Sequence, residues 1–171
     1  ELTEIPGVES VNSILDVPLL SQSGGSLTEL AGNFRTLRDP DVDFDRARIE
    51  LINSPVFSEL VVSVDGMTTA LQLNLVDHSD FEQVKNLKRR LSLKMSQGRI
   101  SDEQKLRLDE VSVEYQRLKD DVNQLNHETI ASIRQVIDKY RPMGHLMLGG
   151  VSMIADDMIS FIRNDLIKFG A

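Results

Sequence analysis

Five acidic side chains in the first third of the chain have the spacing of a calcium-binding loop. They are Asp39, Asp41, Asp43, Asp45 and Glu50. They occupy positions 1, 3, 5, 7 and 12 of a twelve-residue count, where carboxylate oxygens bind Ca²⁺ in an EF-hand. That loop also needs glycine at its sixth position, and this sequence has phenylalanine there. Acidic residues are equally favoured in the first turn of a helix, so the sequence favours a helix start and predicts no metal site.

The other titratable side chains form no recognisable catalytic set. Asp77-His78-Ser79-Asp80 falls where a strand should pass into a helix, and such residues are favoured there as turn and cap residues. His127 lies on a polar arc of a long predicted helix, while His145 lies in an apolar run that predicts a buried histidine. The chain has no cysteine, which excludes thiol nucleophiles, thiolate metal sites and disulfides. We expect no catalytic residue and no cofactor, and therefore no enzyme.

Composition limits the remaining classes of function. The chain has 171 residues, enough for one domain with an appendage. Its 27 acidic and 19 basic residues give a net charge of −8, whereas a nucleic-acid-binding protein needs a basic face. No apolar run approaches the 18 or more residues that indicate a membrane span. Nucleic acid is therefore not an expected partner.

The region before residue 78 predicts a helix and a β-hairpin. Acidic residues open a short helix over 43–52, which Asn53-Ser54-Pro55 ends. Leucine and valine alternate over 60–64 and 71–75 on either side of Asp65-Gly66, a dipeptide typical of a tight β-hairpin turn. Residues 18–40 predict a loop with a short helix near 26–34, and residues 8–15 fit either a helix or a strand.

Two capping-box patterns open a pair of helices. Ser79-x-x-Glu82 begins a helix that ends at Gln97-Gly98, and Ser101-x-x-Gln104 begins one that continues to about Tyr140. The second helix carries a heptad seam, formed by Leu108, Val111, Tyr115, Leu118, Val122 and Leu125. The pattern predicts an antiparallel helical hairpin with its tip near 97–100.

The heptad seam changes phase after Leu125, which indicates a change of packing partner. Its next apolar residues, Ile130, Ile133 and Ile137, should lie on the sheet, so the helical hairpin should project from the domain. Three apolar residues near the tip exceed what a solvated tip requires: Leu93, Met95 and Ile100. Either they contact a partner or they pack within the hairpin.

The last third predicts a strand and a helix. The apolar run over 143–150 is typical of a buried strand, and Ser152 is a plausible N-cap for a helix that ends before Gly170. Together these patterns predict a sheet core covered by Ile133 and Ile137. Its other members are Leu60, Val62, Leu71, Leu73, Leu75, Leu146 and Leu148.

Six phrases of the sequence occur in a distinctive order. They are Pro6-Gly7-Val8-x-x-Val11-x-Ser13-Ile14-x-Asp16-Val17-Pro18-Leu19-Leu20, Asp43-x-Asp45-x-Ala47-Arg48, Ser54-Pro55-Val56-Phe57, Val62-Ser63-Val64-Asp65-Gly66-x-Thr68-Thr69-Ala70-Leu71, His145-Leu146-x-Leu148-Gly149-Gly150-Val151-x-Met153-Ile154 and Asn164-Asp165-Leu166-x-x-Phe169-Gly170. In this order they resemble the first large extracytoplasmic loop of resistance-nodulation-division superfamily exporters, in the branch of the MMPL and Patched-like hydrophobe exporters. The resemblance covers roughly 6–76 and 128–170.

The resemblance implies an α+β fold of split βαβ, ferredoxin-like character, with an antiparallel sheet and helices on one face. It implies a porter-type subdomain over 1–78 and 127–171, a strand over 8–17, and a last helix that leads toward a membrane. Residues 79–126 are then an inserted helical hairpin. Where the family commonly has proline, this chain has Ser152. Proton-relay carboxylates of the superfamily lie in membrane helices, so the resemblance assigns none here.

The expected function is that of a periplasmic part of a proton-driven exporter in the inner membrane. It would contribute to the binding and passage of hydrophobic or amphiphilic, lipid-like cargo. Its partners would be the other domains of the transporter, together with a second copy or an accessory protein at the helical hairpin. The alternative is a free-standing coiled-coil interaction protein, and a hydrolase or metal enzyme is the remaining class.

Overall fold

The computed structural model describes residues 1–20 and 34–169 and divides the chain into two compact units. One unit is Glu9–Asn74, and the other combines Glu1–Val8 with Leu75–Ala171. Across the described residues, four α-helices accompany one two-stranded antiparallel sheet. The predicted α+β class is therefore correct.

The sheet pairs strands that are far apart in the sequence. Strand β1 (Val8–Asn12) lies beside β2 (Gln72–Leu75), and the Asn74 side-chain amide donates a 2.8 Å hydrogen bond to the Ser10 hydroxyl. Beyond β1 the chain turns into a short 3-10 helix, Ile14–Asp16. The strand expected over 8–17 is thus confirmed only for its first five residues.

The β-hairpin expected over 60–75 forms only next to its turn, where Ser63 donates a backbone hydrogen bond to Thr68 and Ala70 donates one to Val61. Gly66 donates a backbone hydrogen bond of 2.8 Å to the Ser63 carbonyl and has a positive φ of 67°, as a tight turn requires. Past this turn the two arms share one isolated bridge, between Val62 and Thr69. The second arm becomes β2, whose partner is β1 and not residues 60–64.

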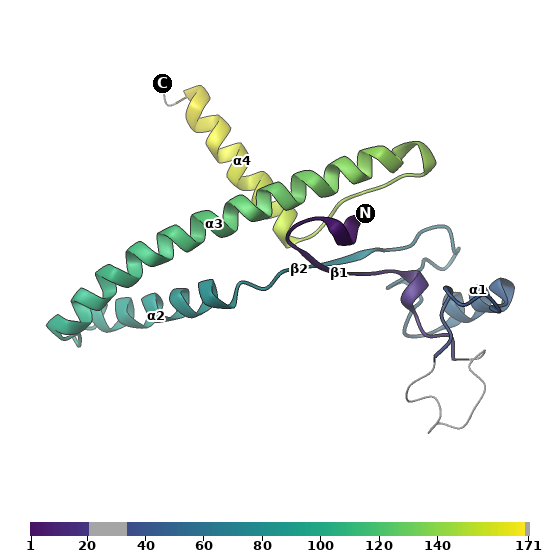
Figure 1. Cartoon of the computed structure of the whole chain (residues 1–171), viewed down its shortest axis with the longest axis horizontal. Coiled ribbons are helices and arrows are strands. Elements are labelled where there is room, and N and C mark those ends of the chain that lie inside the picture. The colour runs from purple at the N-terminus through teal and green to yellow at the C-terminus, as the bar shows by residue number, and fades with distance from the viewer. Residues whose placement is uncertain (21–33, 170–171) are drawn as a thin grey trace. The chain divides into compact units, whose positions relative to one another are not determined.

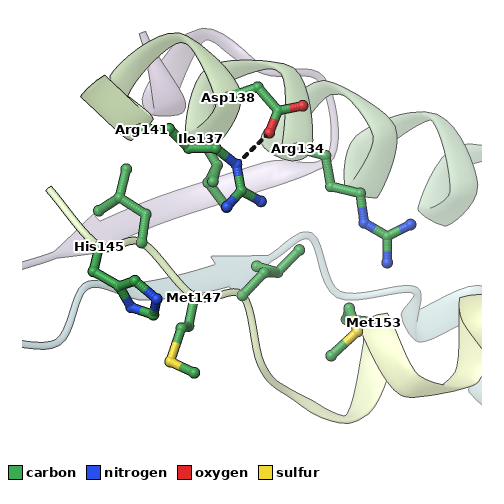
Figure 2. A pocket seen from close by; sticks show the side chains of 9 residues that line it. Arg134, Ile137, Asp138, Arg141, His145, Met147 and Met153 are labelled. Carbon is green, nitrogen blue, oxygen red and sulfur yellow. Dashed lines mark hydrogen bonds and ion pairs between the residues drawn. The ribbon is translucent and has the colours of Figure 1, made fainter. Parts of the chain in front are cut away.

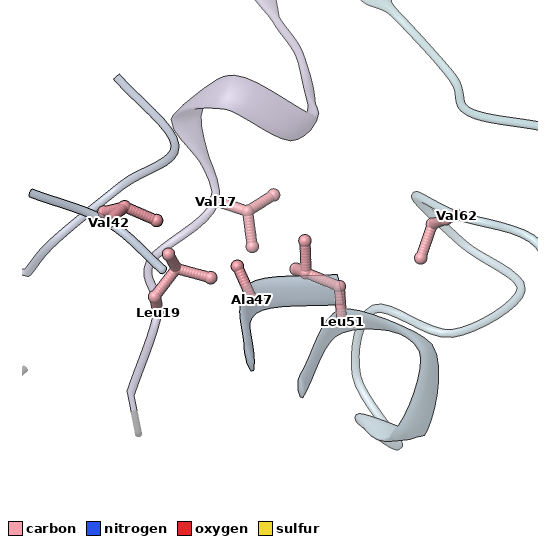
Figure 3. Packing of buried hydrophobic residues seen from close by; sticks show 6 residues of the cluster. All are labelled: Val17, Leu19, Val42, Ala47, Leu51 and Val62. Atoms are coloured by element: carbon pink, nitrogen blue, oxygen red, sulfur yellow. The ribbon is translucent and has the colours of Figure 1, made fainter. Parts of the chain in front are cut away.

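The core of the unit Glu9–Asn74 is a small apolar cluster around helix α1 (Phe44–Asn53). Figure 3 shows its six members: Val17, Leu19, Val42, Ala47, Leu51 and Val62. The Asp43 carboxylate caps α1 by accepting 3.1 Å hydrogen bonds from the backbone amides of Asp45 and Arg46. The helix expected over 43–52 is confirmed, and its capping acid accounts for part of the acidic run.

The predicted sheet core is only partly buried. Val62 and Ile133 are buried, but Leu60 and Leu71 are 74% and 55% exposed, which contradicts the prediction for both. The remaining predicted members are half-buried: Leu73, Leu75, Ile137, Leu146 and Leu148. The physical reason is that residues 60–64 and 71–75 do not pair as one hairpin along their length, so the single face that it was expected to bury is not built.

The helical hairpin is present, with α2 (Ser79–Ser96) antiparallel to the first half of α3 (Asp102–Tyr140) (Figure 1). The Phe81 and Tyr115 rings stack between the two helices with centroids 5.5 Å apart. At the start of α3, Ser101 and Gln104 form the predicted capping box. The Ser79 capping box is wrong, because Ser79 is already helical and no side chain caps α2 at His78.

The change of seam within α3 coincides with a change of packing partner, as predicted. The hairpin half buries Leu108 and Val111, and the second half buries Thr129, Ile130 and Ile133. At Thr129 the new neighbour is the N-terminal segment, since the Thr129 hydroxyl lies 2.8 Å from the Pro6 carbonyl oxygen and 2.7 Å from that of Leu125. At Thr129, α3 thus contacts the residues before β1. The main neighbours of α3 among the described elements are α2, α4 and the 3-10 helix Arg141–Met143, so the prediction that Ile130, Ile133 and Ile137 lie on the sheet is not confirmed.

The strand predicted over 143–150 does not form. A 3-10 helix (Arg141–Met143) leads into extended backbone over 144–150, and α4 spans Val151–Phe169. Because no strand neighbours this segment, Leu146 and Leu148 are only half-buried and His145 is exposed, not buried. Ser152 lies inside α4, so it is not the N-cap. The helix expected near 26–34 falls almost wholly outside the described residues.

None of the helices in the described residues combines the length and the apolar character that crossing a membrane requires.

Replacing Gly7 should destabilise the unit that contains α3. Gly7 has a φ of +90°, and a β-carbon there would lie 2.2 Å from the Thr129 hydroxyl oxygen. We expect Gly7→Ala to lower the free energy of unfolding by about 2–4 kcal/mol, measured by urea denaturation. Gly98→Ala is the control, because Gly98 also has a positive φ but nothing within 4 Å of its β-carbon. Equal losses in the two variants would show that the close approach is unimportant.

Asp16 should show a pH effect on the unit Glu9–Asn74. Hydrogen bonds from Arg38 and Ser13 lower the pKa of Asp16 from 3.8 to about 2. A carboxyl with a depressed folded-state pKa contributes stability above its unfolded pKa and loses it as pH falls through the folded value. Stability should therefore decline between about pH 4 and pH 2. NMR titration should show the Asp16 pKa rising in Arg38→Gln and unchanged in Arg46→Gln.

Candidate functional site

The acidic run does not assemble a cation site. Asp43 caps α1, and the Asp39 carboxylate accepts a 2.6 Å hydrogen bond from the backbone amide of Thr36. Among residues 1–20 and 34–169, no group of three or more metal-ligating side chains lies close enough together to hold an ion. Asp39 and Asp43 therefore act in a local turn and a helix cap, whereas the Glu50 carboxylate accepts a 2.5 Å hydrogen bond from the backbone amide of Leu20.

A groove lies between the end of α3, the extended segment 144–150 and the start of α4 (Figure 2). Its volume is about 510 Å³. Polar side chains of α3 and the extended segment contribute Arg134, Asp138, Arg141 and His145. Apolar side chains contribute Ile137, Leu146, Met147, Leu148 and Met153. The groove therefore combines an apolar lining with two guanidinium groups.

The charges around this groove are partly neutralised by neighbouring carboxylates. Arg141, at the start of the 3-10 helix that follows α3, donates to Asp138 of α3 at 2.7 Å (Figure 2). Arg134 donates to Asp157 of α4, also at 2.7 Å. Both arginine side chains stay substantially exposed, Arg134 at 43% and Arg141 at 62%. Each guanidinium keeps unused N–H donors, so the groove suits an amphiphile with an apolar body and an acceptor-bearing head group.

Two polar pairs join α4 to α3. His127 lies 2.8 Å from Asp156, which is only 9% exposed, and Arg134, two turns further along α3, bonds Asp157. We call these two pairs the α3–α4 clasp. A buried carboxylate needs such a partner to offset its lost hydration. The sequence carries a signal for these pairs, because Asp156 and Asp157 are adjacent on one helix and His127 and Arg134 lie seven residues apart on another.

Most apolar side chains of α4 lie away from the clasp and face no other part of the described chain. They are 50–85% exposed: Val151, Ile154, Met158, Ile159, Phe161, Ile162, Leu166, Ile167 and Phe169. Figure 1 shows α4 leaving α3 after its first turns. Contiguous exposed apolar surface of this extent is typical of an interaction site.

The three predicted tip residues lie at the hairpin tip, but they do not share one environment. Leu93 and Met95 are 54% and 56% exposed, whereas Ile100 is half-buried in the connection between the helices. Leu93 and Met95 are thus accessible to a partner, and partner contact there stays a prediction.

Comparison with protein-family models, with curated proteins and with solved structures finds no match to this chain. The family resemblance therefore rests on the phrases in the sequence alone.

The α3–α4 clasp should hold α4 in place. We expect His127→Gln with Arg134→Gln to speed amide hydrogen exchange in the first half of α4 by about fivefold, because the partners of Asp156 and Asp157 are removed. Exchange in α2 should be unchanged. Arg117→Gln with Lys119→Gln, on the hairpin half of α3, is the matched control and should leave α4 exchange as it was. Unchanged exchange in both variants would contradict a role for the clasp.

Proposed function

We propose that this chain is an extracytoplasmic porter segment, of split βαβ type, in a proton-driven exporter of the resistance-nodulation-division superfamily, MMPL and Patched-like branch. The observation that carries the proposal is the ordered set of phrases over roughly 6–76 and 128–170. The chain contributes to the binding and passage of hydrophobic or amphiphilic cargo. Its role is binding and conformational change and involves no bond chemistry.

The groove supports this proposal because one of the phrases supplies much of its lining. His145, Leu146 and Leu148 belong to the phrase that ends at Ile154, and Met153 lies on the same groove. Their apolar surface suits hydrocarbon, and Arg134 and Arg141 suit an acceptor-bearing head group. The residues that carry part of the family resemblance thus also line a surface whose chemistry suits an amphiphilic cargo.

The exposed apolar face of α4 also supports the proposal. A last helix that leads toward a membrane or packs on other domains of a transporter needs an apolar exterior, and α4 presents one once its polar side is held by the clasp. A free-standing coiled-coil interaction protein could present such a face to its partner as well. Apolar stretches of about 20 residues on both sides of the segment, read from the complete gene, would support the exporter over that alternative.

Protease accessibility in cells tests the location. The turn around Gly98 is exposed and has nothing within 4 Å of a β-carbon, so it should accept an inserted protease site. In the full-length protein, we expect cleavage in cells whose cytoplasmic membrane is intact and whose outer layers admit the protease. A cytoplasmic reporter with the same site should stay uncut. Cleavage that requires lysis would place the segment in the cytoplasm and refute the proposal.

Two equally exposed methionines provide a matched test of the groove. Met143 and Met147 are each 83% exposed, but only Met147 lines the groove. In the full-length protein we expect Met147→Asp to abolish proton-dependent efflux of a lipophilic fluorescent dye, because a carboxylate there opposes apolar cargo. Met143→Asp should retain efflux. Efflux retained in both variants would remove the groove from the transport path.

A further inference from the structure

The helical hairpin carries two outward stripes of opposite charge. Residues 83–101 contain six bases and no acid, although the chain as a whole has a net charge of −8. On the side of α2 away from α3, these bases include Arg89, Arg90 and Lys94, which surround the exposed Leu93. In the part of the chain that the structure describes, none of these three has an acidic partner within ion-pair distance. We call this surface the basic stripe.

The outward side of α3 has the opposite charge. Asp102 and Asp109 are seven residues apart, and so are Leu106 and Val113, so the four share one side of the helix. This side is opposite the seam of Leu108 and Val111, and Leu106 and Val113 are 66% and 73% exposed. Asp120 lies two turns beyond Val113 on the same side, and Asp102 is paired with Lys105 at 2.9 Å. We call this surface the acidic stripe.

The two stripes match in height above the tip. Counted from the helix ends at Ser96 and Asp102, at 1.5 Å per residue, Leu93 and Leu106 lie about 4.5 and 6 Å along their helices. Arg90 and Asp109 lie about 9 and 10.5 Å along theirs. Two hairpins placed side by side with their tips level would therefore set leucine against leucine and arginine against aspartate. The helices in contact, α2 of one and α3 of the other, would run antiparallel.

We propose that the helical hairpins of separate copies associate in this way, with the basic stripe of one copy on the acidic stripe of the next. The partner is a second copy because the complementary stripe is carried by the same chain, at the same height. Each hairpin offers both stripes on opposite sides, so the contact is heterologous and repeats head to tail until a ring closes. This inference does not depend on the proposed function.

Cysteine cross-linking of the whole chain tests the contact directly, because the sequence has no cysteine of its own. We expect a mixture of Leu93→Cys and Leu106→Cys chains to give a disulfide-linked dimer on mild oxidation. Either variant alone should stay largely uncross-linked. In the control, Ser92→Cys chains are mixed with Leu106→Cys chains and should give little dimer, since Ser92 is exposed at the same height but lies beside the basic stripe. Dimers from Leu93→Cys alone would mean a symmetric contact and would overturn the proposal, as would a mixture that gives none.

Charge exchange separates a specific contact from loss of folding. Arg90→Glu in the Leu93→Cys chain, or Asp109→Arg in the Leu106→Cys chain, should each lower the cross-linking rate about fivefold. Both changes together should restore it, and added salt should weaken the unmodified pair. Circular dichroism confirms the helix content of each variant. Failure of the double change to restore cross-linking in folded chains would refute the pairing.

Anionic vesicles distinguish a lipid surface from a second copy. Vesicles of phosphatidylglycerol and phosphatidylcholine should sediment the chain no more than neutral vesicles do, because the basic stripe is occupied by the acidic stripe. A chain that stays uncross-linked and sediments with anionic vesicles, in a manner lost in Arg89→Glu with Arg90→Glu, would overturn the proposal in favour of a lipid surface.

Discussion

The close approach of the N-terminal segment to the middle of α3 is the constraint on which the larger unit depends. Gly7 leaves no space for a β-carbon beside Thr129, and the Thr129 hydroxyl bonds the Pro6 carbonyl across 2.8 Å. The backbone of Gly7 then accepts a 3.0 Å hydrogen bond from Val76, just beyond β2. One glycine thus links the segment before β1, the segment after β2 and α3, and Ile5 and Val8 are buried on either side of it.

This constraint explains how α3 serves two purposes. Its first half is covered by α2, and its second half contacts the N-terminal segment at Thr129. The hairpin half therefore needs only one apolar side, and its other side is free to vary without cost to the core. Opposite charges on the outer sides of α2 and α3 are a surface property of this kind, because no buried contact of the hairpin requires them.

Local patterns in the sequence predict individual helices and strands. Which of these elements pack together depends on contacts between residues far apart in the sequence. The capping box of Ser101 and the acids before α1 act within one helical turn, so the sequence alone predicts them. Alternation over 71–75 predicted a strand correctly but assigned its partner to the nearest arm, whereas β2 pairs with β1, about 60 residues earlier. The groove was missed for the same reason: Arg134 and His145 meet only because the chain folds back after Tyr140.

The helix α4 reverses the usual arrangement of an amphipathic helix, and this determines what it requires of its surroundings. An amphipathic helix normally packs its apolar side on its own chain, but α4 meets α3 through Asp156 and Asp157. Ion pairs in partly exposed positions contribute little stability, whereas each large apolar side chain left in water forgoes about 1.5–3 kcal/mol of burial. Burial of Phe161, Ile162 and Leu166 against another surface would therefore stabilise α4 more than its ion pairs with α3 do. The clasp holds the polar side of α4 on α3 and so leaves these apolar side chains on the outside.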